Sequence, residues 1–272
     1  MSEPNQGSNN EKQSDHRYLE DTNALSNIKR VIAVISGKGG VGKTAVTALL
    51  ATTMAKKGYK CAIIDADIRC GVLPKLFGVT DQIVGNANLM FPAETKSGIK
   101  MISSYLLIDE PAKPVLWKSS VAGGAVKQFW TDVKWGDVDY MFIDCPSGTG
   151  DVPLVVLQSI KIDGVIVVST PQELASMIAV KAAEMAKLIG VPVFGFIENM
   201  SGTICPHCDG DISLYGKSSV PEIAKKYGLP VLAEIPHDIS IAEAGDLGTF
   251  EELDVDYADP AVDKIERGLP TK

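Results

Sequence analysis

Residues Gly37–Thr44 have the types and spacing of a loop that holds phosphate groups. They read Gly-Lys-Gly-Gly-Val-Gly-Lys-Thr and fit the pattern G-x-x-x-x-G-K-[ST]. Glycines let backbone N–H groups converge on phosphate oxygens, and the N-terminus of a following helix adds positive potential. The Lys43 ammonium is expected to reach the β- and γ-phosphates, and the Thr44 hydroxyl to bind Mg²⁺. A glycine-rich turn without a ligand is the alternative, and the complete pattern argues against it.

Two carboxylates stand where apolar runs end. Asp144 follows Met141–Ile143, and a carboxylate there can hold the water shell of the magnesium ion. Asp67 closes a second run and is predicted to orient the attacking water, whereas a turn or helix-capping residue is its plainer interpretation. A solvated strand end is the plainer interpretation of Asp144. The glycine-flanked loop Pro146–Asp151 suits a segment that responds to the γ-phosphate.

The sequence favours adenine over guanine as the base. It contains no Asn-Lys-x-Asp motif, which reads guanine. Asn199 ends a later apolar run and offers a donor and an acceptor on one amide. A turn asparagine is the alternative interpretation of this residue.

Cys205 and Cys208 form a second candidate site. Their Cys-x-x-Cys spacing lets two thiolates bind one metal ion or one edge of a cluster. A structural zinc or a [4Fe–4S] cluster needs about four protein ligands, so two chains in a symmetric dimer would complete the set. Three alternatives stay open: a redox dithiol, zinc in place of iron, and two unreactive surface thiols. His207 between them is either a ligand or a loop residue.

Short apolar runs and helix-like patterns alternate from residue 30 onward, which predicts the elements that position these groups. Continuous apolar strands separated by helices indicate a doubly wound α/β fold, with a mostly parallel sheet and helices on both faces. Ligands of such sheets bind at the carboxyl ends of the strands. The segment Asp81–Lys127 has no regular pattern. The predicted strands are Val31–Ile35, Cys61–Ile64, Tyr140–Ile143, Gly164–Val168, Val193–Ile197 and Val231–Ile235, and the predicted helices are Thr44–Lys57, Glu173–Ile189 and Val220–Tyr227.

The composition is that of a globular chain with an acidic balance. The 272 residues are 45% hydrophobic and 22% charged, and the net charge of 26 − 34 = −8 disfavours general nucleic-acid binding. Five cysteines, an odd number, argue against a secreted disulfide scaffold and for the reducing cytoplasm. No apolar run reaches the roughly 18 residues of a membrane span, so no membrane association is expected. Cys61, Cys70 and Cys145 are predicted to be structural thiols, and a reactive thiol is the alternative interpretation of Cys70 and of Cys145.

One large domain accounts for the motif spacing. Residues 1–27 are rich in Ser, Asn, Gln and Glu and are predicted to be a disordered leader. Residues 28–250 are predicted to form a P-loop ATPase domain. Residues 251–272 are predicted to be an acidic C-terminal tail.

Taken together, the motifs resemble the Mrp/ApbC (NBP-type) family of iron–sulfur cluster carrier ATPases. This family lies within the MinD-like class of P-loop ATPases, whose mark is a second lysine in the loop, here Lys38. The resemblance implies a homodimer that sandwiches ATP, with Lys38 crossing to the partner's nucleotide, and a weak ATPase activity needed for cluster transfer. The matching segments are Gly37–Lys43, Asp65–Ile68, Asp144–Asp151, Thr170–Gln172, Glu198–Ser201 with Cys205 and Cys208, and Ile235–Asp238.

The resemblance also implies partners and a cargo. Cys205 and Cys208 of each chain would bridge a labile [4Fe–4S] cluster, received from scaffold proteins and passed to apo iron–sulfur proteins. The chain is expected to be the short form of the family, with a transferable-cluster site only. The implied catalytic residues are Lys38, Lys43 and Asp67, and the implied magnesium ligands are Thr44 and Asp144. The implied ATP contacts are Gly37, Lys38, Gly39, Gly40, Val41, Gly42, Lys43, Thr44, Ala45, Asn199 and Pro236.

The chain departs from the family pattern at three places. Ala45 stands where the family commonly has a threonine, so it offers no hydroxyl to the α-phosphate. Arg69–Val72 replaces Tyr-Gly-Pro-Ser directly after the aspartate motif, which alters the contacts of the first switch segment. Trp117–Ser120 replaces the usual Trp-Arg-Gly-Pro.

Two other classes of function are open. A MinD/ParA-like positioning ATPase would attach to membranes through a basic amphipathic helix or to DNA through a basic patch. Here residues Glu251–Pro260 are acidic and end in proline. A reductase-type electron donor related to the nitrogenase iron protein would use one cysteine from each of two separated segments. The close pair Cys205 and Cys208 argues against that arrangement.

Overall fold

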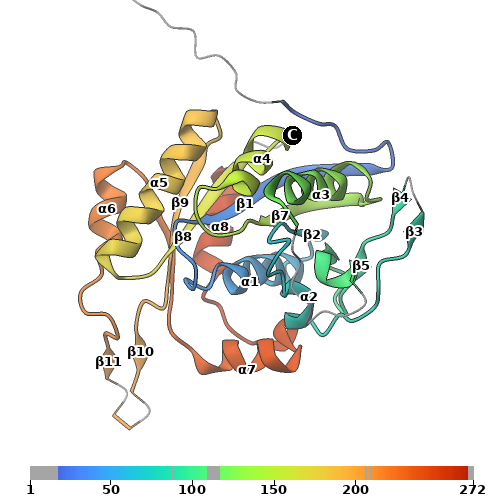
Figure 1. The fold of residues 1–272 in the computed structure, drawn as a ribbon. Helices are drawn as coiled ribbons and strands as arrows, with labels where there is room; N and C mark the ends of the chain where they lie inside the picture. The colour runs from blue at the N-terminus through green and yellow to red at the C-terminus, as the bar shows by residue number, and fades with distance from the viewer. Residues whose placement is uncertain (1–17, 87–88, 109–116, 206, 209, 269–272) are drawn as a thin grey trace, which may run out of the picture.

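A mostly parallel eight-stranded sheet forms the centre of the molecule. Figure 1 shows the computed structural model, which describes residues 18–86, 89–108, 117–205, 207–208 and 210–268. The strand order is β12-β9-β8-β1-β7-β2-β6-β5, and every neighbouring pair is parallel except β5 with β6. These strands are β1 (Ser26–Ser36), β2 (Cys61–Asp65), β5 (Ala93–Glu94), β6 (Lys100–Ile102), β7 (Gly136–Asp144), β8 (Gly164–Ser169), β9 (Val193–Asn199) and β12 (Val231–Ile235).

Helices cover both faces of this sheet, and two short hairpins lie outside it. The hairpins pair β3 (Gly85–Asn86) with β4 (Leu89–Met90) and β10 (Thr203–Ile204) with β11 (Asp211–Ile212). Single 3₁₀ turns lie at Ser104–Leu106 and Phe250–Glu252. The helices are α1 (Lys43–Lys56), α2 (Leu73–Leu76), α3 (Ser119–Thr131), α4 (Asp151–Ser159), α5 (Glu173–Ile189), α6 (Val220–Lys226), α7 (Ile239–Leu247) and α8 (Asp259–Gly268).

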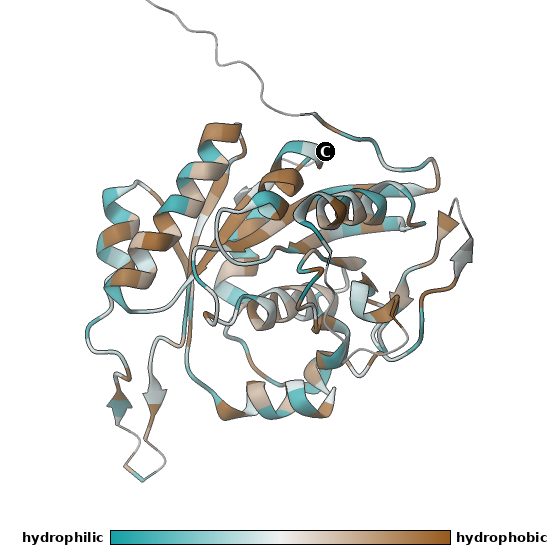
Figure 2. Cartoon of the chain, viewed as in Figure 1, coloured by the Kyte–Doolittle hydropathy of each residue, from teal (hydrophilic) through white to brown (hydrophobic). Residues whose placement is uncertain are grey.

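The alternation of side chains along β1 divides the core into two layers. Val31, Ala33 and Ile35 face the layer that holds α3, α4, α5 and α6. Ile32 and Val34 face the layer that holds α1 and α8. A parallel strand buried on both faces needs apolar residues at successive positions, which is why it reads as a continuous run. Figure 2 shows the same arrangement as apolar colour along the central strands.

The predicted fold class is confirmed. The predicted strands lie within observed ones, and the long helix Glu173–Ile189 has the observed bounds, ending at Gly190 with φ 83°. β1 begins before the predicted start, because Ser26 and Asn27 pair with β7 although their side chains are not fully buried. The irregular segment 81–127 holds short strands and most of α3, which the sequence pattern did not predict.

The predicted leader differs from the structure in its last ten residues. Residues 1–17 lie outside the described part of the chain, whereas residues 18–27 are attached to the domain. The Tyr18 N–H donates to the Gln158 carbonyl at 2.8 Å, and the Trp130 indole donates to the Glu20 carbonyl at 2.9 Å. Asn23 donates to two carbonyls at the end of α3 and after it. The polar composition of this segment therefore serves hydrogen bonding to the domain surface.

The predicted acidic tail contains part of the hydrophobic core. Ala261, Val262 and Ile265 on α8 are buried, and the helix packs against α1, β9 and β12. Its acidic side chains face outward, where Asp263 and Glu266 pair with Lys57 at 2.6 and 3.0 Å. The core thus continues past the predicted boundary at residue 250. None of the described helices is long and apolar enough to span a bilayer.

Truncation of Ile265 tests whether α8 belongs to the core. Ile265→Ala is expected to lower the free energy of unfolding by about 3 kcal/mol, because it removes a fully buried side chain and leaves a cavity. Arg267→Ala on the exposed face is expected to change it by less than about 0.5 kcal/mol. Urea titration followed by circular dichroism measures both. Equal small effects would show that α8 does not stabilise the domain.

Candidate functional site

The phosphate loop connects β1 to α1 at the carboxyl edge of the sheet. Its glycines are required by space and by backbone conformation. A Cβ atom at Gly37 would overlap the backbone of Ile178 on α5, and Gly40 and Gly42 have φ values of 78° and 76°. A Cβ atom at Gly42 would also overlap the Asn199 amide. The loop therefore packs closely against α5 and the end of β9.

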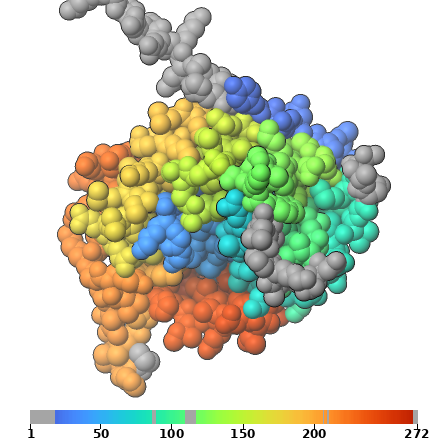
Figure 3. All heavy atoms as spheres, in the orientation of Figure 1, coloured from blue at the N-terminus to red at the C-terminus, as the bar shows by residue number. Residues whose placement is uncertain are grey.

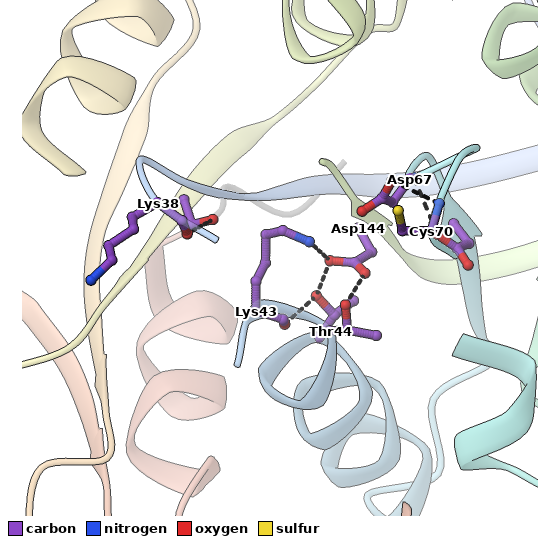
Figure 4. Close-up of polar contacts among 9 residues, drawn as sticks. Lys38, Lys43, Thr44, Asp67, Cys70 and Asp144 are labelled. Atoms are coloured by element: carbon purple, nitrogen blue, oxygen red, sulfur yellow. Dashed lines mark hydrogen bonds and ion pairs between the residues drawn. The ribbon is translucent and has the colours of Figure 1, made fainter. Parts of the chain in front are cut away.

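Lys43, Thr44 and Asp144 meet at this edge (Figure 4). The Lys43 Nζ lies 2.6 Å from Asp144 Oδ1, and the Thr44 hydroxyl donates to Asp144 Oδ2 at 2.7 Å. The Thr47 hydroxyl donates to Asp144 Oδ1 at 3.2 Å. β1 and β7 are adjacent parallel strands, so the loops that follow them lie side by side. A hydroxyl and a carboxylate at one point make an oxygen donor set that fits Mg²⁺.

Burial and charge act against each other at Lys43. Burial would lower the pKa of this ammonium, but the Asp144 carboxylate beside it holds the pKa above its ordinary value. Asp65 lies on the neighbouring strand, in register with Asp144. Burial, together with the Asp144 charge, raises the pKa of Asp65 to about 7, and the Ser103 hydroxyl donates to it at 2.8 Å. The positive charge of Lys43 thus lies beside two buried acidic side chains, Asp144 and Asp65.

Asp67 follows β2, the strand paired with the one that ends at Asp144, and Lys38 lies in the phosphate loop. Asp67 Oδ1 accepts the Cys70 N–H at 3.3 Å, so its carboxylate caps the turn that follows β2. This contact is the one expected of a turn-capping aspartate, and a role of Asp67 in orienting water stays a proposal. The exposed Lys38 side chain points away from Lys43 and Asp144 (Figure 4). Its ammonium is therefore directed outward from the phosphate site of its own chain.

A largely apolar cavity of about 310 Å³ opens beside the start of α1. Gly42, Ala45, Asn199 and Pro236 line it, so four predicted ATP contacts share one cavity. The Asn199 Nδ2 donates to the Val41 carbonyl at 2.9 Å, which leaves the amide oxygen as the acceptor. An acceptor in this place suits the exocyclic amine of adenine. None of the other residues that line this cavity is among the predicted ATP contacts. They are Leu76, Met200, His237, Asp238, Ile241, Ala242, Gly245, Asp246 and Phe250.

The cysteine pair lies on an exposed hairpin. We call β10, β11 and the turn between them the thiol hairpin; it extends away from the body of the molecule (Figures 1 and 3). Cys205 is half-buried and Cys208 is exposed. Hydrogen bonds from the His207 N–H and from the thiol and N–H of Cys208 lower the pKa of Cys205. Backbone donors around a sulfur favour the thiolate, the form that binds metal.

The thiol hairpin supplies an incomplete ligand set. Within the described residues, no group of three or more His, Cys, Asp or Glu side chains is placed to hold a metal ion. Cys61 and Cys145 are buried, and burial raises the pKa of each thiol to about 12. Cys70 is exposed, which differs from the prediction of a structural thiol. The prediction holds for the two buried cysteines, of which Cys61 lies inside β2, as predicted, and Cys145 directly follows β7.

Comparison with known proteins assigns the chain to a family. Residues 27–267 match the family described as NUBPL iron-transfer P-loop NTPases, within the ParA group. The chain belongs to this iron-transfer NTPase family. The iron–sulfur cluster carrier protein of Methanocaldococcus jannaschii is 43% identical over 227 residues, which cover 82% of this chain and 78% of that protein. The carrier protein of Clostridium perfringens is 42% identical over 234 residues, covering 83% and 82%.

Solved structures share this fold, and one of them holds ADP. A nucleotide-binding protein from Archaeoglobus fulgidus, in complex with ADP and with cobalt found in it, is 40% identical with a TM-score of 0.74. The match covers 85% of this chain and 90% of that one. The cell division ATPase MinD of Pyrococcus furiosus is 25% identical with a TM-score of 0.63, covering 88% and 99%. The predicted membership in a MinD-like family of iron–sulfur carrier NTPases is confirmed.

Proposed function

We propose that this iron-transfer NTPase is an ATP-hydrolysing carrier of [4Fe–4S] clusters that works as a homodimer in the cytoplasm. The observation that carries the proposal is the exposed pair Cys205 and Cys208, held on a hairpin of a domain with a phosphate loop. Each chain offers two thiolates, so two chains together offer four, and a cluster needs about four protein ligands. An exposed cluster on a projecting hairpin is accessible to an apo-protein. Five free thiols suit a reducing compartment.

The nucleotide site supplies the second half of the proposal. The loop N–H groups and Lys43 bind the phosphates, while Thr44 and Asp144 hold Mg²⁺. The ion, when bound, neutralises charge on the β- and γ-phosphates. Asp67 orients the water that attacks the γ-phosphorus, and Lys38 reaches the nucleotide of the second chain. Asn199 accepts from the adenine amine.

Metal analysis of the reconstituted protein tests the proposal. After anaerobic reconstitution with ferrous iron and sulfide, we expect about two irons and two sulfides per chain. Light scattering on the same sample is expected to give the mass of a dimer. Incubation with an apo iron–sulfur protein is expected to move the iron to that protein, faster with MgATP. A loaded monomer, or zinc held in place of iron under these conditions, would contradict the proposal.

A further inference from the structure

We call the cavity beside the start of α1 the base cavity, and the segments before β10 and after β11, residues 200–202 and 213–219, the first and second legs of the thiol hairpin. The first leg is hydrogen-bonded to the wall of the base cavity. The Ser201 N–H donates to the Ile235 carbonyl at 3.0 Å, and the His237 N–H donates to the Gly202 carbonyl at 2.6 Å. These two bonds lie on either side of Pro236, which lines the cavity. A change in the position of this wall therefore moves the leg that leads to Cys205.

The second leg is anchored elsewhere. The Ser218 hydroxyl donates at 2.6 Å to Glu198, a buried residue of β9. The Ser219 hydroxyl donates at 3.1 Å to the Pro171 carbonyl, ahead of α5. The first leg is thus fixed to the end of β12 and to His237 in the cavity wall, whereas the second leg is fixed to β9 and to the loop ahead of α5. A shift of Pro236 and His237 relative to β9 therefore changes the tilt of the hairpin, because the second leg stays bonded to β9.

Met200 joins the cavity to both legs. It follows Asn199 directly, lines the cavity, and is the one non-glycine residue with positive φ, 58°, among the described residues. L side chains rarely adopt this conformation, and such residues often stand at functional sites. The Met200 Cε lies 3.7 Å from where a Cβ atom at Gly42 would be, and its Sδ lies 3.9 Å from the Tyr215 hydroxyl after β11. One side chain therefore reaches from the phosphate loop to the second leg.

We propose that Met200 is a positioning residue through which an adenine nucleotide in the cavity acts on the thiol hairpin. A base seated between Asn199 and Pro236 displaces the cavity wall that holds the first leg. Met200, which contacts Tyr215, moves with this wall and displaces that part of the second leg as well. The tilt of the hairpin changes, and access of reagents to Cys205 and Cys208 falls. The inference rests on the proposed function only in placing the base in this cavity. Coupling of this kind is reciprocal, so a ligand on the two thiols changes nucleotide affinity by the same factor.

Alkylation of the two thiols tests the coupling without any cluster. The full chain, reduced and free of metal, is treated with iodoacetamide with and without saturating MgADP. Peptide mass spectrometry follows each cysteine separately. We expect ADP to slow alkylation of Cys205 and Cys208 about fivefold. Met200→Gly keeps the backbone conformation and removes the side chain. At an ADP concentration that calorimetry shows to saturate the variant, it is expected to reduce the ADP effect to below about 1.5-fold.

Two control variants and the mass in solution separate coupling from general damage. Met200→Leu keeps the apolar bulk and is expected to retain the ADP effect. Leu188→Ala, at an exposed position near the end of α5, is expected to leave it unchanged. ADP binding without a change in alkylation, a full ADP effect in Met200→Gly, or protection seen only in dimeric samples would overturn the inference and leave the proposed function standing. Absence of ADP binding, measured by calorimetry, would overturn both.

Discussion

Replacement of Lys43 by methionine is expected to lower kcat/KM for ATP at least about 100-fold, because an ammonium at the β- and γ-phosphates stabilises the charge of the transition state. The same substitution is expected to destabilise the domain by about 3 kcal/mol. Lys43 and Asp144 have side chains only 8% and 1% exposed, so the variant leaves a buried carboxylate without its cation. Phosphate release and urea titration measure the two effects independently.

The chain contains a matched control for the stability effect. Lys29 and Asp139 form an ion pair with the same 2.6 Å separation, but the Lys29 side chain is 61% exposed. Lys29→Met is therefore expected to cost less than about 1 kcal/mol and to leave ATP hydrolysis unchanged. Equal destabilisation by the two variants would show that burial does not determine the energy of the Lys43–Asp144 pair. Hydrolysis near the wild-type rate in Lys43→Met would remove Lys43 from the phosphate site.

The sequence indicated the centre of this fold because buried parallel strands are continuous apolar runs. The short strand β6 exists through its pairing with β2, which lies far from it in the sequence, and the two-residue strand β5 exists through its pairing with β6. Neither is long enough to show a local pattern that predicts it. The helix α8 was missed for another reason: its net acidic composition hides three apolar positions spaced for one helical face, at Ala261, Val262 and Ile265. Counting helical periodicity within an acidic segment would have found it.

The same distinction applies to the site. The sequence predicted that Lys43, Thr44 and Asp144 lie close together, because adjacent parallel strands end at one edge of the sheet. The turn-capping contact of Asp67 depends on the exact backbone path after β2, which residue types do not specify. The wall of the base cavity that α7 provides has no motif, since apolar residues in a loop-flanked helix read as ordinary packing. Met200 lies in the matching segment Glu198–Ser201, directly after Asn199, but the resemblance gave it no role.

Replacement of Cys205 by serine is expected to reduce iron and sulfide to below about a tenth of the wild-type content after anaerobic reconstitution. A dimer of the variant has two thiolates at the hairpins, one from each chain, whereas a [4Fe–4S] cluster needs about four protein ligands. The hairpin projects away from the phosphate site (Figure 1), so ATP affinity is expected to stay within about threefold of wild type. Iron and sulfide assays, with nucleotide titration on the same samples, measure both.

Cys70→Ser is the matched control, because Cys70 is likewise an exposed cysteine but lies after β2, outside the thiol hairpin. It is expected to keep the full iron content. Full iron in Cys205→Ser would place the cluster ligands elsewhere in the chain, and equal loss in both variants would mean that exposed thiols bind iron without a defined site. Loss confined to Cys205→Ser and Cys208→Ser, together with dimer mass only when iron is bound, would show that the cluster itself joins the two chains. The thiols would then be both the cargo site and the interface, so release of the cluster to an apo-protein would also separate the carrier.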